Sequence, residues 1–295
     1  MIYVDIKGNL GNQMFQYACA RQIQQITGQT ICLNTCFLKK YKPEYIMSLQ
    51  DFELGENVVI EDKKSLPWFA NTYKGIIRYI KGIFPNVFFR AMSYFGVYIW
   101  LREPYRTLEL DFQKKNYYLV GYWQSTKYFD KIDNLIRKEF NPKQPLKKDN
   151  QELFNIINNT ESICVTIRRG DYVTNDKYRK QFFQCDEKYF LKGIRLIKEE
   201  IADSVVIVFS DDIEWVRKNI EFPGTVYYES GKDPVWEKIR LMAACKHFVI
   251  SNSSFSWWVQ HLSENPNKIV YAPSKWYPDG RECDIYEPNW RYIEV

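Results

Sequence analysis

Short apolar runs alternate along the chain with longer amphipathic segments, and this alternation predicts strands that alternate with helices. At the N-terminus, residues 1–6 predict a buried strand, residues 13–27 a helix, and Ile31–Asn34 a second strand. The chain therefore opens as a βαβ unit, whose first turn is a Gly/Asn-rich segment.

The same alternation continues in the second half of the chain. The apolar runs predict strands at residues 117–121, 162–167, 204–209, 225–228, 248–251 and 269–272, and the segments between them predict helices at residues 125–140, 186–200, 212–220, 234–245 and 254–262. Ser125 is a candidate N-cap for the first of these helices. Such alternation is typical of parallel, doubly wound sheets.

Residues 37–118 are less regular, with helical patches interrupted by prolines. A second interruption, at residues 141–149, contains two prolines and three lysines and is the best linker candidate. A chain of 295 residues is long enough for two domains. We therefore expect an N-terminal domain at residues 1–145 and a C-terminal domain at residues 146–295.

Composition excludes several classes of protein. The chain is 45% hydrophobic, so it can form cores and is not a disordered or collagen-like protein. No uncharged apolar stretch is long enough to span a bilayer, the longest being residues 91–101, and no signal peptide is recognised. Seven cysteines without a Cys-x-x-Cys pattern indicate a reducing compartment. We expect a soluble, cytosolic protein.

Metal chemistry is disfavoured by the residues present. The chain has only two histidines, His247 and His261, so a histidine-rich zinc or iron site is not expected. It also lacks an Asp-x-Asp motif, which argues against a magnesium or manganese ion held by paired carboxylates. We expect no metal and no cofactor.

The net charge of +5 is mild and does not indicate a nucleic-acid partner. One segment stands apart, because residues 74–106 contain six basic residues, one acidic residue and nine aromatic residues. This composition suits contact with a membrane surface or a lipid-linked acceptor. The alternative is a helical insertion whose aromatic residues are core and whose basic residues are solvated.

Polar clusters follow three of the predicted strands, and ligands bind at the carboxyl ends of strands in such sheets. The first cluster, Gly8-Asn9-Leu-Gly-Asn12-Gln13, permits close backbone approach and begins a helix with free N–H groups. Gly-rich turns after first strands are common, so this cluster alone is weak evidence. It is not a P-loop, because no Gly-Lys-Ser/Thr sequence follows.

The second cluster is Arg168-Arg169-Gly170-Asp171, directly after an apolar strand. Arginine is always charged and binds phosphate through two parallel hydrogen bonds. Because successive residues of a strand point to opposite sides, we expect one arginine to face the site and the other to brace the loop. Asp171 is either a general base or the salt-bridge partner of an arginine.

The third cluster, Ser251-Asn252-Ser253-Ser254-Phe255, begins a helix, where hydroxyl and N–H groups can bind a phosphate. The alternative is an ordinary N-cap followed by the packing of Trp257 and Trp258 in the core. Residues 210–212, Ser-Asp-Asp, form a similar but weaker cluster. Two anion-binding clusters without a metal pattern fit a nucleotide-diphosphate donor.

Several motifs together resemble the α-1,2-fucosyltransferases of glycosyltransferase family 11. They are Gly8-Asn-x-x-Gly-Asn-Gln-Met-Phe-Gln-Tyr-Ala18, Gly121-Tyr-Trp-Gln-Ser125, Ile167-Arg-Arg-Gly-Asp-Tyr172, Phe209-Ser-Asp-Asp212, and Ser251-Asn-Ser-Ser-Phe-Ser-Trp-Trp258. They occur in the family's order and cover nearly the whole chain.

The resemblance implies a GT-B-like α/β fold, with two Rossmann-type doubly wound domains facing a cleft. It implies the N-terminal domain on the acceptor side and the C-terminal domain as the GDP-sugar-binding domain. It also implies GDP-L-fucose as donor, the 2-hydroxyl of a terminal β-galactoside as acceptor, and inversion without a metal. The residues then expected to bind the donor are Gly8, Asn9, Asn12, Gln13, Arg168, Arg169, Asp212, Asn252, Ser253, Ser254 and Phe255.

This chain departs from the family pattern at three places. Thr166 stands where the family has a histidine, two residues before the first arginine, so no histidine role carries over. Lys238, with Glu237 beside it, stands where related enzymes have an aspartate near the guanine. Val259 replaces a glycine after the tryptophan pair.

The expected reaction is a single displacement at the anomeric carbon of fucose. Arg168, with the amide and hydroxyls of residues 252–254, would stabilise the charge on the leaving pyrophosphate, and Asp171 is the candidate general base. Two alternatives are another sugar-nucleotide-dependent transferase on the same fold and a nucleotide- or glycan-binding module without catalysis. The sequence does not identify the acceptor, which we expect to be a lipid-linked or free oligosaccharide in surface-glycan synthesis.

Overall fold

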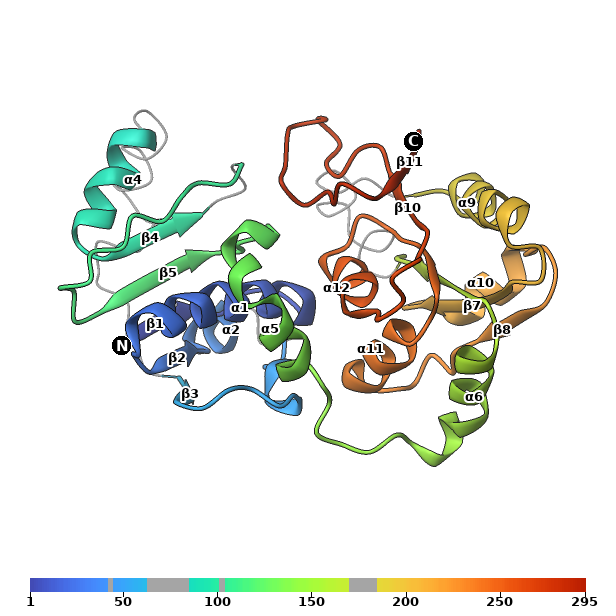
Figure 1. Ribbon diagram of the computed structural model, residues 1–295, viewed down its shortest axis with the longest axis horizontal. Coiled ribbons are helices and arrows are strands. Elements are labelled where there is room, and N and C mark those ends of the chain that lie inside the picture. The colour runs from blue at the N-terminus through green and yellow to red at the C-terminus, as the bar shows by residue number, and fades with distance from the viewer. Residues whose placement is uncertain (42–44, 63–84, 101–103, 170–184) are drawn as a thin grey trace. The chain divides into compact units, whose positions relative to one another are not determined.

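The chain forms two compact α/β units. The computed structural model describes residues 1–41, 45–62, 85–100, 104–169 and 185–295 (Figure 1). Unit 1 comprises Met1–Asn141 together with Cys283–Ile285, and unit 2 comprises Pro142–Glu282 with Tyr286–Val295. The division after Asn141 lies inside the expected linker, four residues before the boundary that the sequence suggests. The return of Cys283–Ile285 to unit 1 was not expected, and it brings Asp284 within 2.5 Å of Lys127.

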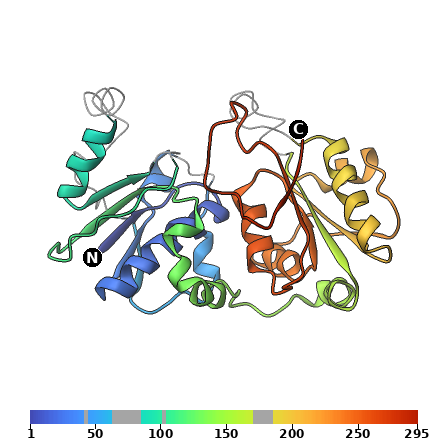
Figure 2. The same ribbon diagram turned by 45° about the horizontal axis from the view of Figure 1, so that its top comes forward.

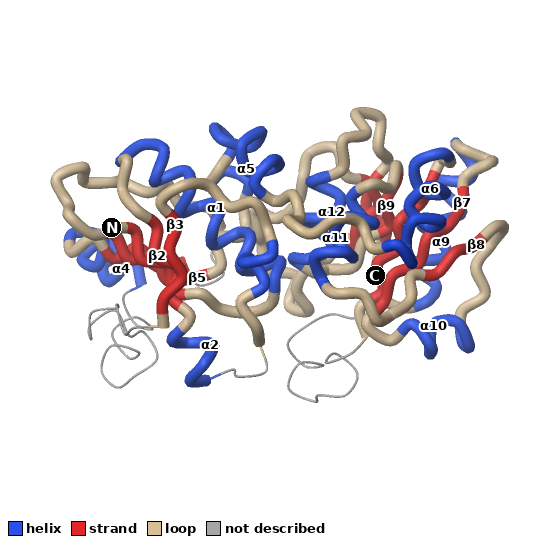
Figure 3. The backbone as a smooth tube through the Cα atoms, turned by 90° about the horizontal axis from the view of Figure 1, so that it is seen from below, coloured by secondary structure: helices blue, strands red, loops and turns tan. Residues whose placement is uncertain are grey.

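Unit 1 is built on a five-stranded parallel sheet of order β3-β2-β1-β5-β4. The strands are β1 (Ile2–Asp5), β2 (Ile31–Asn34), β3 (Val58–Glu61), β4 (Val97–Trp100) and β5 (Tyr117–Gly121). The helices are α1 (Leu10–Thr27), α2 (Cys36–Tyr41), α4 (Pro85–Tyr94) and α5 (Asp133–Glu139). Helix α1 packs on β1, β2 and β5, whereas α4 packs on β4 (Figure 3).

The middle of unit 1 corrects two expectations. Residues 37–118 were expected to form helical patches, but this region also contributes both edge strands, β3 and β4. The segment at residues 125–140 is not one helix, because 3₁₀ turns at Thr126–Tyr128 and Asp130–Ile132 precede α5. Ser125 does act as a cap, since its hydroxyl accepts a hydrogen bond from the Lys127 N–H, but it caps the first 3₁₀ turn.

Unit 2 is built on a six-stranded parallel sheet of order β11-β10-β9-β6-β7-β8. The strands are β6 (Ser162–Ile167), β7 (Val205–Ser210), β8 (Val226–Tyr228), β9 (His247–Val249), β10 (Val270–Pro273) and β11 (Arg291–Ile293). The helices are α6 (Gln151–Asn159), α9 (Glu187–Glu200), α10 (Ile213–Asn219), α11 (Val235–Ala243) and α12 (Ser254–Leu262). The predicted β–α alternation is thus confirmed here.

Helices lie on both faces of the unit 2 sheet (Figure 2). On one face, α9 and α10 form a core with alternate residues of β6, namely Ile163, Val165 and Ile167. Helix α9 approaches the sheet closely at Gly193, where a Cβ atom would lie 2.7 Å from the Val249 side chain. On the other face, α11 packs against α12, whose Trp257 and Trp258 are fully buried. None of the helices in the described part of the chain is both long and apolar enough to cross a membrane.

Candidate functional site

The arginine pair lies at the carboxyl end of β6, and the neighbouring strand β7 supplies its partner. In the parallel register Ile167 is paired with Ser210, so the next residues, Arg168 and Asp211, leave the sheet side by side. Asp211 binds the arginine segment twice. One carboxylate oxygen lies 2.8 Å from Nη1 of Arg168, and the other accepts a hydrogen bond of 2.8 Å from the Arg169 backbone N–H.

The second arginine has different partners. The Arg169 guanidinium lies over the indole of Trp215, 3.2 Å from the ring centroid, and its Nε atom is 3.5 Å from a carboxylate oxygen of Asp212. Its side chain is 16% exposed, whereas that of Arg168 is 28% exposed. Stacking on an indole fixes the plane of a guanidinium and is favourable for the cation. The more exposed Arg168 is therefore the arginine better placed to meet a ligand, and Arg169 is braced.

Thr166, which replaces the expected histidine, connects two strand ends. It is 4% exposed, and its hydroxyl accepts a hydrogen bond of 3.0 Å from the backbone N–H of Ser251, which follows β9. Strand β9 is the neighbour of β6 on the side opposite β7. The three polar segments that follow β7, β6 and β9 are therefore adjacent at the carboxyl ends of the strands of unit 2.

The serine-rich segment after β9 is buried in its first two residues, and it caps α12 with partly exposed residues. The Ser253 hydroxyl accepts a hydrogen bond from the Phe255 N–H at the start of α12, and the hydroxyls of Ser251 and Ser256 are 3.0 Å apart. Asn252 is buried and donates a side-chain hydrogen bond to the Trp276 carbonyl. Ser253, Ser254 and Phe255 are partly exposed at the helix N-terminus. A helix N-terminus of this kind favours an anion.

The expected donor-binding turn of unit 1 is held by hydrogen bonds from amide side chains. Gly8 has a φ of 74°, and Asn9 is the exposed N-cap of α1. The Gln13 side chain is fully buried, donates to the carbonyls of Gly8 and Ile46, and accepts a hydrogen bond from the Ser48 N–H. Asn12 accepts a hydrogen bond of 2.8 Å from Gln124. These contacts fix the shape of the turn.

Other expected residues are placed less directly. Asp171 and Gly170 lie outside the described residues. The carboxylate of Glu237 is fully buried and accepts hydrogen bonds from Asn150, Arg240 and the Lys147 N–H. Lys238 lies 3.4 Å from the buried carboxylate of Glu229, which follows β8.

Both histidine side chains contact other residues of the protein. The Nδ1 atom of His247 accepts a hydrogen bond from the Ile269 N–H, and its Nε2 atom lies 3.0 Å from the Glu161 carboxylate. His261 is stacked on Trp257 with 4.5 Å between ring centroids. Within the described ranges, no group of three His, Cys, Asp or Glu side chains lies close enough to hold a metal ion.

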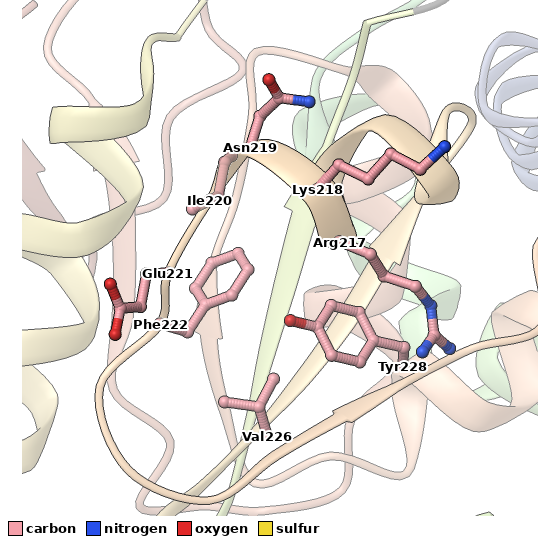
Figure 4. Close-up of a pocket in the computed structure, with 8 residues that line it drawn as sticks. All are labelled: Arg217, Lys218, Asn219, Ile220, Glu221, Phe222, Val226 and Tyr228. Atoms are coloured by element: carbon pink, nitrogen blue, oxygen red, sulfur yellow. The ribbon is translucent and has the colours of Figure 1, made fainter.

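A pocket of about 460 Å³ lies elsewhere in unit 2 (Figure 4). It is lined by the C-terminal half of α10, by the following loop and by Val226 and Tyr228 of the edge strand β8. The Arg217 guanidinium lies 4.3 Å from the centroid of the Tyr228 ring. Helix α10 runs from the carboxyl end of β7 back toward the amino ends of the strands. This pocket is therefore not part of the cluster that contains Arg168, Arg169 and Asp211.

Two residues that contact the arginine pair were not among the expected site residues: Asp211, which was noted only as part of the weaker Ser-Asp-Asp cluster, and Trp215. Asp211 belongs to the Ser-Asp-Asp segment after β7, and a polar residue at the carboxyl end of a predicted strand indicates a ligand site. Trp215 carries no such signal, because an aromatic residue in an amphipathic helix is ordinarily a core residue.

Comparison with known proteins gives a consistent assignment. The family model for "Glycosyl transferase family 11" matches residues 1–294. An alpha-1,2-colitosyltransferase of Escherichia coli is 29% identical, over all of this chain and 99% of the relative. An O-antigen biosynthesis glycosyltransferase of E. coli, WbnK, is 28% identical over 98% of this chain and 99% of the relative. Galactoside alpha-(1,2)-fucosyltransferase 1 of Rattus norvegicus is 24% identical over 97% and 69%.

Solved structures support the fold. The GDP complex of a mutant of Arabidopsis thaliana FUT1 has a TM-score of 0.51 and 10% identity, over 94% of this chain and 71% of that one. POFUT1 in complex with GDP has a TM-score of 0.51 and 13% identity, over 92% and 97%. Together with the two parallel α/β sheets, these similarities establish the GT-B fold class that the resemblance implied. By its sequence over nearly its whole length, the chain is a glycosyltransferase that belongs to glycosyl transferase family 11.

Proposed function

We propose that the protein transfers L-fucose from GDP-β-L-fucose to the 2-hydroxyl of a terminal β-galactoside, with inversion and without a metal ion. The observation that carries this proposal is the partly exposed Arg168 at the carboxyl ends of the strands, where α12 also begins. Both features favour the negative charge of a nucleotide pyrophosphate. The fucosyltransferases among the relatives support the choice of donor sugar and linkage.

In this reaction the acceptor oxygen attacks the anomeric carbon from the face opposite GDP. The bond between that carbon and the phosphate oxygen breaks, the electron pair leaves with GDP, and the acceptor proton passes to a general base. Arg168 and the hydroxyls of Ser253 and Ser254 stabilise the growing charge on the β-phosphate. The Asn252 side chain was expected to take part, but it is buried and donates its hydrogen bond to the Trp276 carbonyl. Asp171 remains the candidate base, which would contribute about 10²- to 10⁴-fold to the rate.

A second donor is favoured by one finding. The E. coli relative that is 29% identical is named a colitosyltransferase, so another deoxy-sugar donor is the alternative for this chain. Both candidates use the same nucleotide-binding edge, and they differ in the sugar that is transferred.

A donor screen separates these alternatives. Purified protein is incubated in EDTA with GDP-fucose, GDP-mannose, UDP-sugars or a colitose donor, over a panel of β-galactosides. We expect transfer from GDP-fucose that EDTA does not reduce. Transfer of colitose alone would select the second donor, and the absence of transfer or hydrolysis with every donor would overturn the proposed activity. Loss of activity in EDTA that one divalent ion restores would overturn the metal-free mechanism.

The proposed acceptor is a lipid-linked oligosaccharide at the cytoplasmic membrane face, with which the protein makes peripheral contact. In the basic, aromatic segment at residues 74–106, some aromatic side chains are buried and others are exposed. Of its aromatic residues, Phe88, Phe89, Tyr98 and Trp100 are buried, as the core interpretation expects. Tyr94 is 73% exposed and Phe95 57% exposed at the end of α4. Lys74, Arg78, Tyr79, Lys81, Phe84 and Arg102 lie outside the described residues.

The exposed pair has cations and a third aromatic residue nearby. The Lys114 ammonium lies 5.0 Å from the centroid of the Tyr94 ring, in a turn that also contains Lys115 and the 68% exposed Phe112. Each basic residue near an anionic surface contributes about 1 kcal/mol. In vesicle sedimentation we expect salt-sensitive binding to anionic lipid that Lys114→Glu combined with Lys115→Glu weakens. Equal binding to neutral vesicles, or none to either kind, would contradict the contact.

A further inference from the structure

The geometry points to Asp211 as the positioning residue of the reaction: it holds Arg168 in the orientation in which this arginine meets the leaving pyrophosphate. This inference rests on the proposed function of Arg168 and adds a residue to it. Asp211 itself contacts neither donor nor acceptor in this scheme. It acts through Arg168.

Asp211 holds the arginine pair at two points. Its two carboxylate oxygens bind the Arg168 guanidinium and the Arg169 backbone N–H, each at 2.8 Å. The Arg168 side chain and the Arg169 peptide N–H are therefore both held by the Asp211 carboxylate. Asp211 is in turn placed by β7, which pairs with β6 along six residues up to Ile167 and Ser210. The sheet therefore fixes the position of Asp211, and Asp211 in turn fixes that of Arg168.

Arg168 and Arg169 are held in different ways. Arg169 is stacked on the neutral ring of Trp215, and its charge is balanced by Asp212. Arg168 is paired with Asp211, and these two side chains are 28% and 25% exposed. A charged guanidinium that loses such a support samples more rotamers, and misplacement by about 1 Å can lower a rate about 10²-fold.

The charge change in the reaction predicts which kinetic constants depend on this support. GDP carries more negative charge on its β-phosphate than the sugar-bound donor does, so an oriented arginine stabilises the transition state and the product more than the ground state. Removal of such a contact lowers kcat and leaves the donor KM nearly unchanged. It also weakens GDP as a product inhibitor.

Asp211→Asn is the decisive variant. The amide oxygen of asparagine can still accept the hydrogen bond from the Arg169 N–H, but the amide group cannot form an ion pair with Arg168. We expect kcat to fall about 10- to 100-fold, the inhibition constant of GDP to rise by a similar factor, and the donor KM to stay within about 3-fold. The unfolding temperature should stay near that of the wild type. Asp203→Asn, an exposed aspartate before the opposite end of β7, is the matched control and should behave as wild type.

A double-mutant cycle tests whether Asp211 acts through Arg168. In the Arg168→Ala background, Asp211→Asn should lower kcat by less than about 2-fold, because the group it orients is gone. An equal loss in both backgrounds would overturn the inference, as would a kcat of Asp211→Asn within about 2-fold of wild type. A general structural defect would instead lower the unfolding temperature and raise the donor KM.

Turnover by the wild-type protein tests the proposed function separately. If the wild type transfers no sugar, the proposed function fails, and the same cycle is then measured on the dissociation constant of GDP by calorimetry. A weaker affinity for GDP in Asp211→Asn, but no further weakening in the Arg168→Ala background, would still support the positioning role. Additive losses there would overturn it.

Discussion

The turn after β1 in unit 1 and the strand ends of unit 2 are both polar and glycine- or serine-rich, but their contacts differ in kind. In unit 1 the amide of Gln13 binds three backbone groups, and the ion pair of Asp5 and Lys7 is buried with 2.7 Å between the charged atoms. In unit 2 the charged side chains of Arg168 and Asp211 remain about one quarter exposed.

The contacts in the two units therefore determine different properties. The contacts of unit 1 determine a backbone conformation, and a change there is expected to act on stability first. The contacts of unit 2 orient charged groups that a ligand can reach, and a change there is expected to act on turnover first. Substitutions in the two units test this distinction.

Arg168→Ala should have the largest effect, because it removes the proposed stabilisation of the leaving pyrophosphate. We expect kcat to fall about 10²- to 10³-fold, the range typical for loss of one such donor. Arg168→Lys should be nearly as damaging, since an ammonium group does not reproduce the two parallel bonds of a guanidinium. Steady-state kinetics provides the measurement, and a near-normal kcat in Arg168→Ala would remove this residue from the mechanism.

Gln13→Ala should act on unit 1 through stability. It leaves the buried Ser48 N–H and the carbonyls of Gly8 and Ile46 without their side-chain partner. A buried group left unpaired costs about 1–3 kcal/mol, so we expect the free energy of unfolding in urea to fall by about 3 kcal/mol. Gln113→Ala, at an exposed glutamine, is the control. A normal stability combined with a large loss of GDP affinity would show that Gln13 instead binds the donor.

Gly8→Ala should cost less, and Gly28→Ala is its matched control. Both glycines have positive φ, 74° and 67°, so both substitutions strain the backbone by about 1–2 kcal/mol. At Gly8 the new Cβ would meet Nδ2 of Asn12 at 2.4 Å, whereas at Gly28 no atom of the described residues lies within 4 Å. We expect an additional loss of about 1 kcal/mol at Gly8, from displacement of Asn12 and its bond to Gln124. Equal losses in thermal unfolding would contradict this account.

The smallest expected effect is on acid stability in unit 2. Burial alone would raise the pKa of Asp233, but hydrogen bonds from Lys147, Ser230 and Asn150 outweigh it and lower this pKa below 3.8. The resulting stability is present above pH 3.8 and is lost as the pH falls through the lower, folded-state pKa. Lys147→Met should therefore make the free energy of unfolding less dependent on pH below about 4. An unchanged dependence would show that the other two hydrogen bonds suffice.

Some features of the fold followed from local sequence. The expected bounds of β2, β5, β6 and α12 coincide with those in the structure, because each is a short run with clear apolar periodicity or a polar cap. Strand β3 was missed because it is an edge strand with exposed apolar residues, Val59 at 37% and Ile60 at 44%. Strand β4 lies inside an apolar run of residues 91–101, and in such a run periodicity does not distinguish a strand from a helix.

The α/β class, the family and the placement of both arginines at a strand end follow from the sequence alone, because they depend on residue order and on local periodicity. The sequence also predicted that one arginine would face the site and the other would brace the loop. Which arginine is stacked and which is more exposed depends on tertiary contacts: the register of β6 with β7 brings Asp211 to Arg168, and α10 brings Trp215 to Arg169. These contacts join residues 43 and 46 positions apart, and no local pattern encodes which distant side chain will stand opposite a given residue.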